Sequence, residues 1–201
     1  MPNGWVWGRL SEIVVITGGG TPSMNNPDFW NGNIPWVTPK DMSSNQINGS
    51  EMKITQLGLD NSSAKLIDDG SILIVGRSGI LRRRLPVAIN LIPCSVNQDM
   101  KVLTPIFKIM NRFLQMMLYG LEQNILRNYV KFGMTVHSLR YDEFSLMPIP
   151  IPPLAEQHRI VNKIDQLIQF CEEIETTIKQ NQNYAQELLQ VALKEALTPV
   201  K

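Results

Sequence analysis

Three residues in the first third of the chain have the types and order that metal-dependent phosphodiester cleavage requires. Asp28 follows a proline, and Glu51 and Lys53 come later, separated by one residue. In many nucleases two such carboxylates hold Mg²⁺ while the lysine assists the attacking water. The pattern is short, however, and the residues after Asp28, Phe-Trp-Asn-Gly-Asn, predict a turn rather than a catalytic strand. A metal-dependent nuclease is therefore an alternative hypothesis and not the main interpretation.

A cluster of arginines indicates a different chemistry, the binding of nucleic acid. Arg77, Arg82, Arg83 and Arg84 fall within eight residues, and Ser78 stands among them. A guanidinium group binds phosphate oxygens and can donate two hydrogen bonds to the edge of guanine. The cluster comes directly after a short apolar run that predicts a strand, so we expect it on a loop that contacts DNA. A solvated charged loop is the alternative.

Polar side chains in other predicted loops are candidates for further base contacts. Amides and hydroxyls read base edges in the grooves of DNA, although loops contain such groups for other reasons as well. A duplex exposes no base faces for stacking, so we expect the aromatic rings of Trp30, Trp36 and Phe132 in the core. The polar candidates are Thr21, Ser23, Asn25, Asn26, Lys40, Asn97 and Gln98.

Other patterns argue against a catalytic or cofactor site. The run from Gly18 to Thr21 lacks the Gly-Lys-Ser/Thr of a phosphate loop and is followed by Pro22, so it predicts a turn. His137 and His158 have no residues at metal-ligand spacing around them. No nucleophile elbow or dinucleotide fingerprint is present. We therefore expect no catalytic residue, no metal and no cofactor in this chain.

The composition is that of a folded chain with little excess charge. Of its 201 residues, 43% are hydrophobic, which is enough for a core. No run approaches the roughly 18 to 20 apolar residues of a membrane span, and the first ten residues lack the apolar stretch of a signal peptide, so we expect a cytoplasmic protein. The two cysteines, Cys94 and Cys171, form no C-x-x-C pattern, and we expect both to behave as small apolar residues.

Charge is distributed unevenly along the chain. Residues 1–152 hold 14 Lys and Arg against 11 Asp and Glu, a net charge of +3. Residues 153–201 hold 5 against 7, a net charge of −2. The basic excess lies in the first part but is modest, so phosphate attraction alone would not hold this chain on DNA.

The last part of the chain has the spacing of a coiled-coil helix. Apolar residues recur in alternating steps of four and three, a heptad seam that continues for five repeats after Pro152 and Pro153 end the preceding segment. Such a helix must pack on another helix. The polar Asn181 on the seam either fixes the register of the two helices or is a solvated position without such a role. The seam consists of Ile160, Ile164, Leu167, Cys171, Ile174, Ile178, Asn181, Ala185, Leu188, Ala192 and Glu195.

The first part has mixed periodicity. Residues 107–130 place apolar side chains near helical spacing, with a break near Gly120, and the methionine pair Met116 and Met117 is expected in the core. Short apolar runs bounded by turn residues predict strands over Glu12–Thr17, Ile34–Thr38, Ser71–Val75, Pro86–Asn90 and Met100–Leu103. The sequence thus predicts an α+β globular domain over residues 1–152 and a long helix over residues 153–197.

The junction between the two parts resembles a known family. The stretch from Met147 to Leu167, MPIPIPPLAEQHRIVNKIDQL, is similar to the hallmark of type I restriction-modification specificity subunits, in which a strand ending in prolines runs into a long helix. The resemblance covers nearly the whole chain. Further similar segments, in order, are Gly4-Trp5 with Leu10, Gly18 to Ser23, Ile34 to Pro39 with Asp41-Met42, Val75 to Gly79, and Asn97 to Asp99.

The resemblance implies a target-recognition domain followed by a spacer helix. Members of this family usually hold two such domains, whose helices pair antiparallel, whereas this sequence has one of each. The missing half is then a second copy, another half-subunit or the remainder of a longer polypeptide. The opening Met1 to Trp5 resembles the usual beginning of a recognition domain, so we expect a natural front boundary. A self-paired copy would be two-fold symmetric and would read an inverted repeat.

The resemblance also implies the partners. The recognition domain would read one half of a bipartite target in double-stranded DNA, and the helix would dock methyltransferase subunits that carry S-adenosylmethionine and flip the target adenine. A restriction subunit that uses ATP and Mg²⁺ would join them. These cofactors are expected only on the partners, so the chain itself would be non-catalytic. A coiled-coil assembly protein with no DNA role is the second alternative.

Overall fold

The computed structural model describes residues 2–197, apart from the side chains of Glu195 and Ala196. The last position of the predicted seam, Glu195, therefore lies outside the described residues. The chain divides into two compact units, of which the first ends at Gln157 and the second begins at His158. We call the first unit the head.

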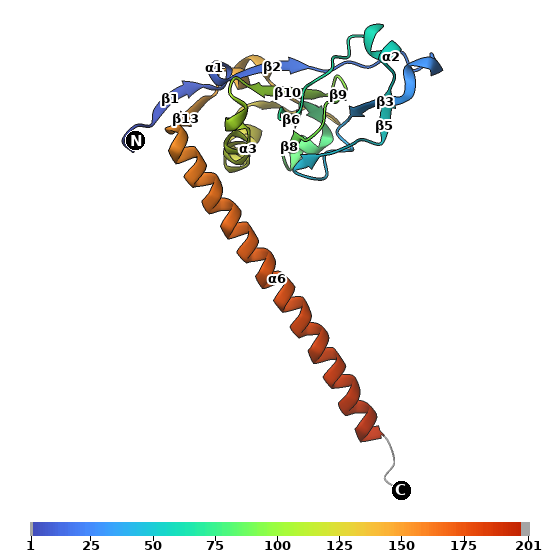
Figure 1. Cartoon of the computed structure of the whole chain (residues 1–201), viewed down its shortest axis with the longest axis vertical. Helices are drawn as coiled ribbons and strands as arrows, with labels where there is room; N and C mark the ends of the chain where they lie inside the picture. The colour runs from blue at the N-terminus through green and yellow to red at the C-terminus, as the bar shows by residue number, and fades with distance from the viewer. Residues whose placement is uncertain (1, 198–201) are drawn as a thin grey trace. The chain divides into compact units, whose positions relative to one another are not determined.

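A five-stranded sheet forms the centre of the head (Figure 1). Its strand order is β2-β10-β6-β8-β4, and all neighbours are antiparallel except β4 and β8. Every residue of β6 and β8 is buried, which explains why both strands appear in the sequence as continuous apolar runs. The strands are β2 (Val14–Gly18), β10 (Met100–Pro105), β6 (Ile72–Val75), β8 (Val87–Asn90) and β4 (Gln46–Ile47).

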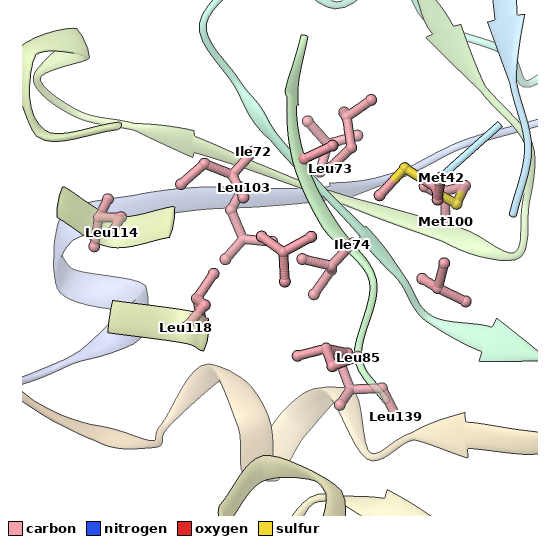
Figure 2. Packing of buried hydrophobic residues seen from close by; sticks show 14 of the residues in the cluster. Met42, Ile72, Leu73, Ile74, Leu85, Met100, Leu103, Leu114, Leu118 and Leu139 are labelled. Carbon is pink, nitrogen blue, oxygen red and sulfur yellow. The ribbon is translucent and has the colours of Figure 1, made fainter. Parts of the chain in front are cut away.

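Two helices follow the sheet strands, as the apolar spacing predicted. α3 (Asn111–Gly120) and α4 (Glu122–Asn128) are separated at Leu121, one residue after the predicted break. Figure 2 shows Leu114 and Leu118 of α3 facing the residues of the central strands, and both are buried. Met117 is partly buried and packs against the same core, as predicted, and Met116 is half-buried. A short 3₁₀ turn, η3 (Lys108–Met110), connects β10 to α3.

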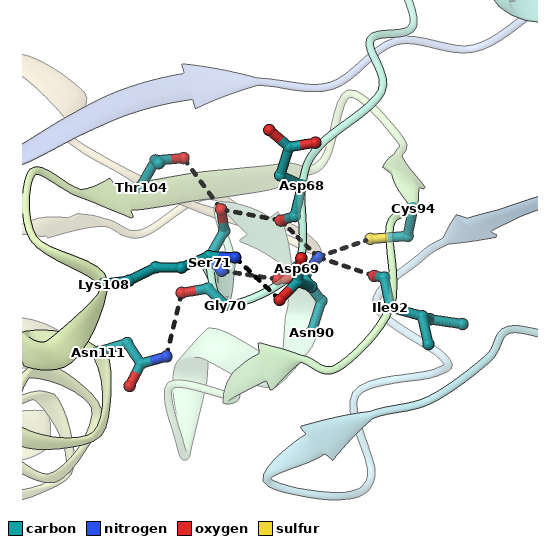
Figure 3. Close-up of polar contacts among 10 residues, drawn as sticks. All are labelled: Asp68, Asp69, Gly70, Ser71, Asn90, Ile92, Cys94, Thr104, Lys108 and Asn111. Atoms are coloured by element: carbon teal, nitrogen blue, oxygen red, sulfur yellow. Dashed lines mark hydrogen bonds and ion pairs between the residues drawn. The ribbon is translucent and has the colours of Figure 1, made fainter.

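One buried polar residue holds the chain around the start of β6 (Figure 3). The side-chain oxygen of Asn90, which is fully buried, accepts a hydrogen bond from the Ser71 amide at 2.8 Å. Its amide nitrogen donates to the carbonyl oxygens of Asp68 and Ile92, each at 3.0 Å. It also lies 3.6 Å from the sulfur of Cys94. Because each of these polar groups has a partner, burying Asn90 is favourable rather than costly.

A second, three-stranded sheet of order β5-β3-β9 extends the head. It consists of β3 (Trp30–Val37), β5 (Met52–Ile54) and β9 (Ser95–Val96), and a bulge in β3 places Asn31 at a φ of 61°. Asparagine tolerates this left-handed conformation better than most residues. Trp36 is buried, and Trp30 packs edge-on against it at 5.1 Å between ring centroids, so the core placement of these two rings is confirmed. Two short helices, η1 (Pro27–Phe29) and α2 (Gln56–Asp60), flank this sheet.

The two ends of the head are joined by a strand pair that the sequence did not reveal. β1 (Val6–Arg9) pairs antiparallel with β13 (Pro148–Ile151). Between β1 and β2 lies the short helix α1 (Leu10–Ile13), so the strand predicted over Glu12–Thr17 is wrong in its first two residues. The carboxylate of Glu12 accepts a hydrogen bond from the Arg9 amide at 2.7 Å, which caps α1. A further short helix, α5 (Tyr141–Ser145), precedes β13.

The long helix α6 (Leu154–Leu197) contains 44 residues, about 66 Å at 1.5 Å per residue. It begins directly after the two prolines, as predicted, and the amides of Glu156 and Gln157 donate to the Pro153 carbonyl. All described side chains from Gln166 onward are exposed, including the seam residues. Within residues 2–197, no helix is long and apolar enough to cross a membrane.

Candidate nucleic-acid interface

The arginine cluster begins where β6 leaves the central sheet. β7 (Arg77–Ser78) is followed by the 3₁₀ turn η2 (Gly79–Arg82). The amides of Gly76 and Arg77 both donate to the Asp99 carbonyl, at 2.7 and 2.9 Å. The Ser78 hydroxyl accepts from the Ile80 amide at 3.3 Å and so caps η2. These backbone contacts hold the Arg77 side chain at the surface, where it is exposed.

A surface hollow, which we call the first hollow, brings Arg77 together with residues distant in sequence. Ser78 and Gln98, two other predicted candidates, lie beside Arg77 in it. Thr21, which is also a candidate, reaches the same place because its hydroxyl donates to the side-chain oxygen of Gln98. The structure thus assembles four predicted residues from three separate segments. The residues that line the first hollow are Pro39, Arg77, Ser78, Gly79, Gln98, Asp99 and Val136.

A second hollow adjoins the first and contains Lys40. The two hollows share Pro39 and Asp99. The carboxylate of Asp41 accepts from the Thr38 amide and hydroxyl at 2.8 and 2.9 Å and from the Glu51 amide at 2.9 Å, which fixes the turn that presents Lys40. The second hollow is lined by Met24, Trp36, Thr38, Pro39, Lys40, Asp41, Glu51, Met52, Asn97 and Asp99.

The rest of the arginine cluster lies away from the first hollow. Arg82 and Arg83 are exposed at the end of η2, and Arg84 lines another hollow together with Tyr119 and Glu122. The carboxylate of Glu122 accepts from the Leu85 amide at 2.8 Å. No hydrogen bond or ion pair joins the guanidinium groups of the cluster to other described residues, and the structure does not bring all four together.

The remaining polar candidates differ in their surroundings. Ser23 and Asn25 are exposed on either side of Met24, and the Ser23 carbonyl accepts from the indole nitrogen of Trp30 at 3.1 Å. The Asn26 side chain caps η1 by accepting from the amide of Asp28. Asn97 is buried, and its side-chain oxygen accepts from the Asp99 amide at 3.1 Å. The last two side chains thus shape turns, whereas Ser23 and Asn25 face solvent.

The glycine run has a packing role. A Cβ atom on Gly19 would lie 2.1 Å from the Val96 carbonyl oxygen, and one on Gly20 would lie 2.4 Å from the Ala64 amide nitrogen. Only glycine allows the chain to pass this close to the backbone of two other segments. No helix opens directly after the run, but the predicted turn is wrong, because Gly18 ends β2 and residues 19–23 are irregular.

The residues of the nuclease pattern lie on different local structures. Asp28 is part of η1, and its carbonyl accepts from the Thr55 hydroxyl at 2.7 Å. Lys53 is on β5 and pairs with Pro35, whereas Glu51 lines the second hollow. Across residues 2–197, no group of three or more His, Cys, Asp or Glu side chains could hold a metal ion.

A hairpin beside the first hollow was missed in the sequence. It consists of β11 (Val130–Lys131), β12 (His137–Leu139) and the loop between them. Phe132 was predicted in the core, and this is wrong, because it is 57% exposed on that loop. The prediction rested on a duplex exposing no base faces for stacking, which does not require the ring to be buried. The signal available was the alternation of Phe132, Met134 and Val136 around Gly133, which is typical of a short hairpin.

Comparisons with known proteins agree with this architecture. Residues 2–182 match the family model of the type I restriction modification DNA specificity domain. The chain is 42% identical over 160 residues to the EcoR124I/EcoR124II specificity subunit of Escherichia coli, covering 79% of this chain and 40% of that protein. It is 28% identical over 188 residues to the MjaIX specificity subunit of Methanocaldococcus jannaschii, covering 90% and 41%. The chain therefore spans about two-fifths of the length of these relatives.

Solved structures share the fold at lower identity. A chain from a structure of the type I R-M system superposes with a TM-score of 0.74 at 23% identity, over 98% of this chain and 46% of that one. The HsdS subunit from Thermoanaerobacter tengcongensis gives a TM-score of 0.64 at 22% identity, over 88% and 40%. Both support the α+β head with a long helix. Together with the family match over most of its length, these similarities establish that this chain belongs to the type I restriction modification DNA specificity domain family.

Proposed function

We propose that the head reads one half of a bipartite target in double-stranded DNA and that the chain carries out no chemistry itself. The observation that carries this proposal is the first hollow, in which Arg77 and Ser78 lie beside Gln98 although Gln98 comes from a separate segment. Membership in the DNA specificity domain family supports the same function. The residues that would make the contacts are predicted ones together with Asp99, which the sequence analysis did not select.

The first hollow offers the hydrogen-bonding groups that base readout requires. The guanidinium of Arg77 matches the two acceptors of guanine, and the amide of Gln98 matches adenine. The carboxylate of Asp99 can accept from the amino group of cytosine. Lys40 in the second hollow and, away from the first hollow, the exposed Arg82 to Arg84 would supply positive charge for phosphates, which position the protein without specifying sequence.

The helix α6 would set the distance between two half-sites. Its exposed seam includes Leu167, Ile174 and Ile178, which are 51%, 43% and 50% exposed in the single chain. Such a seam favours pairing with another helix. The proposed mate is the α6 helix of a second copy in antiparallel orientation, so the dimer would read an inverted repeat separated by a fixed unread spacer.

The proposed assembly includes further subunits. Methyltransferase subunits carrying S-adenosylmethionine would dock on the helices, and a restriction subunit using ATP and Mg²⁺ would join them. The names of the similar specificity subunits from type I restriction enzymes support these partners. This chain would contribute sequence recognition alone.

The proposal is tested by selecting bound duplexes from a random pool, using the full chain with and without a methyltransferase subunit. An inverted repeat is the expected consensus, whereas two unlike half-sites would indicate a different partner half. On the selected duplex, Arg82→Ala with Arg83→Ala should weaken binding. Affinity decreases as the salt concentration rises, and the plot of log affinity against log salt concentration should become less steep by about 1.8. Each phosphate that is no longer neutralised reduces the steepness by about 0.9.

A matched control is Lys108→Ala. Lys108 follows the opposite end of β10 from Asp99, and its ion pair with Asp69 is exposed, so its removal should change neither the slope nor the fold appreciably. An unchanged slope in the double arginine variant would show that Arg82 and Arg83 do not contact the phosphates of DNA. Dimers without affinity for DNA at any salt concentration would indicate an assembly protein, and Mg²⁺-dependent cleavage abolished by Glu51→Ala would indicate a nuclease.

A further inference from the structure

The hairpin loop between β11 and β12 exposes three apolar side chains. Met134 at its tip is 104% exposed, and Phe132 and Val136 on either side are 57% and 41% exposed. If this hairpin loop contacted only water, we would expect polar residues at these three positions. This concentration of apolar surface therefore points to contact with another molecule.

The hairpin tip is held in one conformation by His137. This side chain is buried, and its Nδ1 atom accepts a hydrogen bond from the Gly133 amide at 3.2 Å. The ring of Phe132 packs edge-on against the imidazole with 5.1 Å between centroids. A Cβ atom on Gly133 would lie 2.4 Å from the Val136 carbonyl oxygen, so glycine is required for this tight turn. The apolar side chains are thus presented by a preorganised loop.

The hairpin belongs to the same surface as the first hollow. β12 pairs with β7, and His137 and Ser138 lie opposite Ser78 and Arg77. The amide of Leu139 donates to the Gly76 carbonyl at 2.8 Å, which continues this attachment. Val136 itself lines the first hollow. Any duplex that reaches Arg77 therefore lies within reach of the hairpin tip.

The shape of a hairpin favours one groove of DNA. The major groove is about 12 Å wide and admits a two-stranded β-ribbon as it stands, whereas the minor groove is about 6 Å wide and must be widened for strands to enter, which costs deformation energy. The only apolar group on the base edges of the major groove is the C5-methyl group of thymine. Met134 has an unbranched, flexible side chain that adapts to such a group.

We propose that the hairpin enters the major groove and that Met134 contacts the methyl group of a thymine, which makes this residue a determinant of the half-site sequence. Phe132 and Val136 exclude water from that contact. The inference rests on the proposed function and extends it from hydrogen-bonded readout at the first hollow to apolar readout at the adjoining hairpin.

The test uses the full chain and its selected duplex, in which each thymine is replaced singly by uracil. This exchange removes only the methyl group. At one thymine, binding by the wild type should weaken about fourfold, which corresponds to one buried methyl group at ~0.8 kcal/mol. Met134→Gln, of similar length and at a fully exposed position, should bind about fourfold more weakly and should no longer distinguish thymine from uracil there.

The control variant is Phe107→Gln. Phe107 is 65% exposed, but it follows the far end of β10, about 20 Å from Asp99 for a strand of this length. This variant should keep the full discrimination against uracil. The inference is overturned if Met134→Gln retains that discrimination, if uracil binds as well as thymine at every position, or if the selected half-sites contain no A·T pair. In those cases the chain still binds DNA, whereas a chain that binds no duplex would overturn the proposed function as well.

Discussion

The leucine side chains of the central sheet in the head are buried, whereas those on the seam of the helix α6 are exposed. Leu103 in the central sheet is fully buried, whereas Leu167 on the seam of α6 is 51% exposed. The head buries the apolar side chains of its central sheet in a core of its own, so this core is encoded within the chain. The helix leaves its apolar surface open, so its stability depends on what packs against it.

Polar groups show the same difference. Asn90 in the head has hydrogen-bond partners for both its oxygen and its nitrogen within the same unit. Asn181 lies on the exposed seam of α6, where a partner would come from the mate helix. The polar contacts of the head are therefore internal, whereas a contact of Asn181 on the seam would require a second helix. Substitutions can be chosen that affect only the head or only the helix α6.

The largest effect is expected from Leu167→Asp with Ile174→Asp. Burial of each of these side chains on pairing contributes about 1.5 to 3 kcal/mol to the free energy of association. The double substitution therefore removes ~3 to 6 kcal/mol per helix, and pairing weakens by at least a hundredfold. Light scattering should then give the mass of one chain, 22.8 kDa, instead of twice that value. Urea unfolding of the head should not change.

The matched control places two aspartates on the opposite face of α6. Gln169→Asp with Thr176→Asp adds the same charge at exposed positions off the seam, and it should leave the dimer intact. If both double variants dissociate the dimer equally, charge rather than the seam holds it. If the wild type is itself monomeric with a folded helix at micromolar concentration, self-pairing is excluded.

The next largest effect compares one substitution in the two regions. Leu103→Ala opens a cavity between the central sheet and α3 and should lower the free energy of unfolding of the head by about 2 to 5 kcal/mol. Leu167→Ala removes the same atoms from an exposed position and should leave that free energy within about 0.5 kcal/mol. Urea titration followed by tryptophan fluorescence measures both, because all four tryptophans lie in the head. Equal losses would contradict the division into two independent units.

A smaller loss is expected from Asn90→Ala. The substitution leaves the buried amide of Ser71 without its partner, whereas the Asp68 carbonyl keeps a hydrogen bond from the Ser71 hydroxyl and Ile92 is only partly buried. One unsatisfied buried group costs about 1 to 3 kcal/mol. Asn181→Ala should leave the head unchanged and alter only the pairing of α6. Urea unfolding separates the two, and a loss below about 0.5 kcal/mol for Asn90→Ala would show that water replaces the missing partner.

Much of the architecture was predictable because its signals are local. The apolar runs of β6, β8 and β10 and the heptads of α6 are set by neighbours along the chain, and their predicted bounds differ from the observed ones by only one or two residues. The strand β1 was not predicted, since it is defined by its pairing with β13 at the other end of the head. Short strands whose only support is a distant partner carry little local signal.

The candidate site was predictable as a set of residue types but not as a place. Arg77 and Gln98 could be selected by their chemistry, whereas their meeting in the first hollow depends on the Asp99 carbonyl accepting from β7. The hairpin reaches that hollow only through the pairing of β12 with β7. The periodicity of a sequence does not show such long-range pairings.

The smallest effect on stability at neutral pH is expected from the titration of a cysteine, and the two cysteines report on the head and the helix separately. Burial raises the pKa of the Cys94 thiol from its ordinary value of 9.0 to about 11, with a hydrogen bond from Asn90 acting in the opposite direction. Because the folded pKa is the higher one, the neutral thiol stabilises the head. This contribution is complete below pH 9 and is lost as the pH rises through 11. Comparing the pH dependence of unfolding in Cys94→Ala and in the wild type isolates it.

Thiol labelling then separates the head from the helix. At about pH 8 Cys94 should react only when the head unfolds, because it is buried and protonated, whereas Cys171 is exposed in the single chain and should react at once. Cys171 also lies on the seam, so pairing of α6 should bury it and slow its labelling as the protein concentration rises. The rate for Cys94 should not depend on concentration. If Cys171 reacts at one rate from nanomolar to high micromolar protein while light scattering reports a dimer, the helices pair through a face other than the predicted seam.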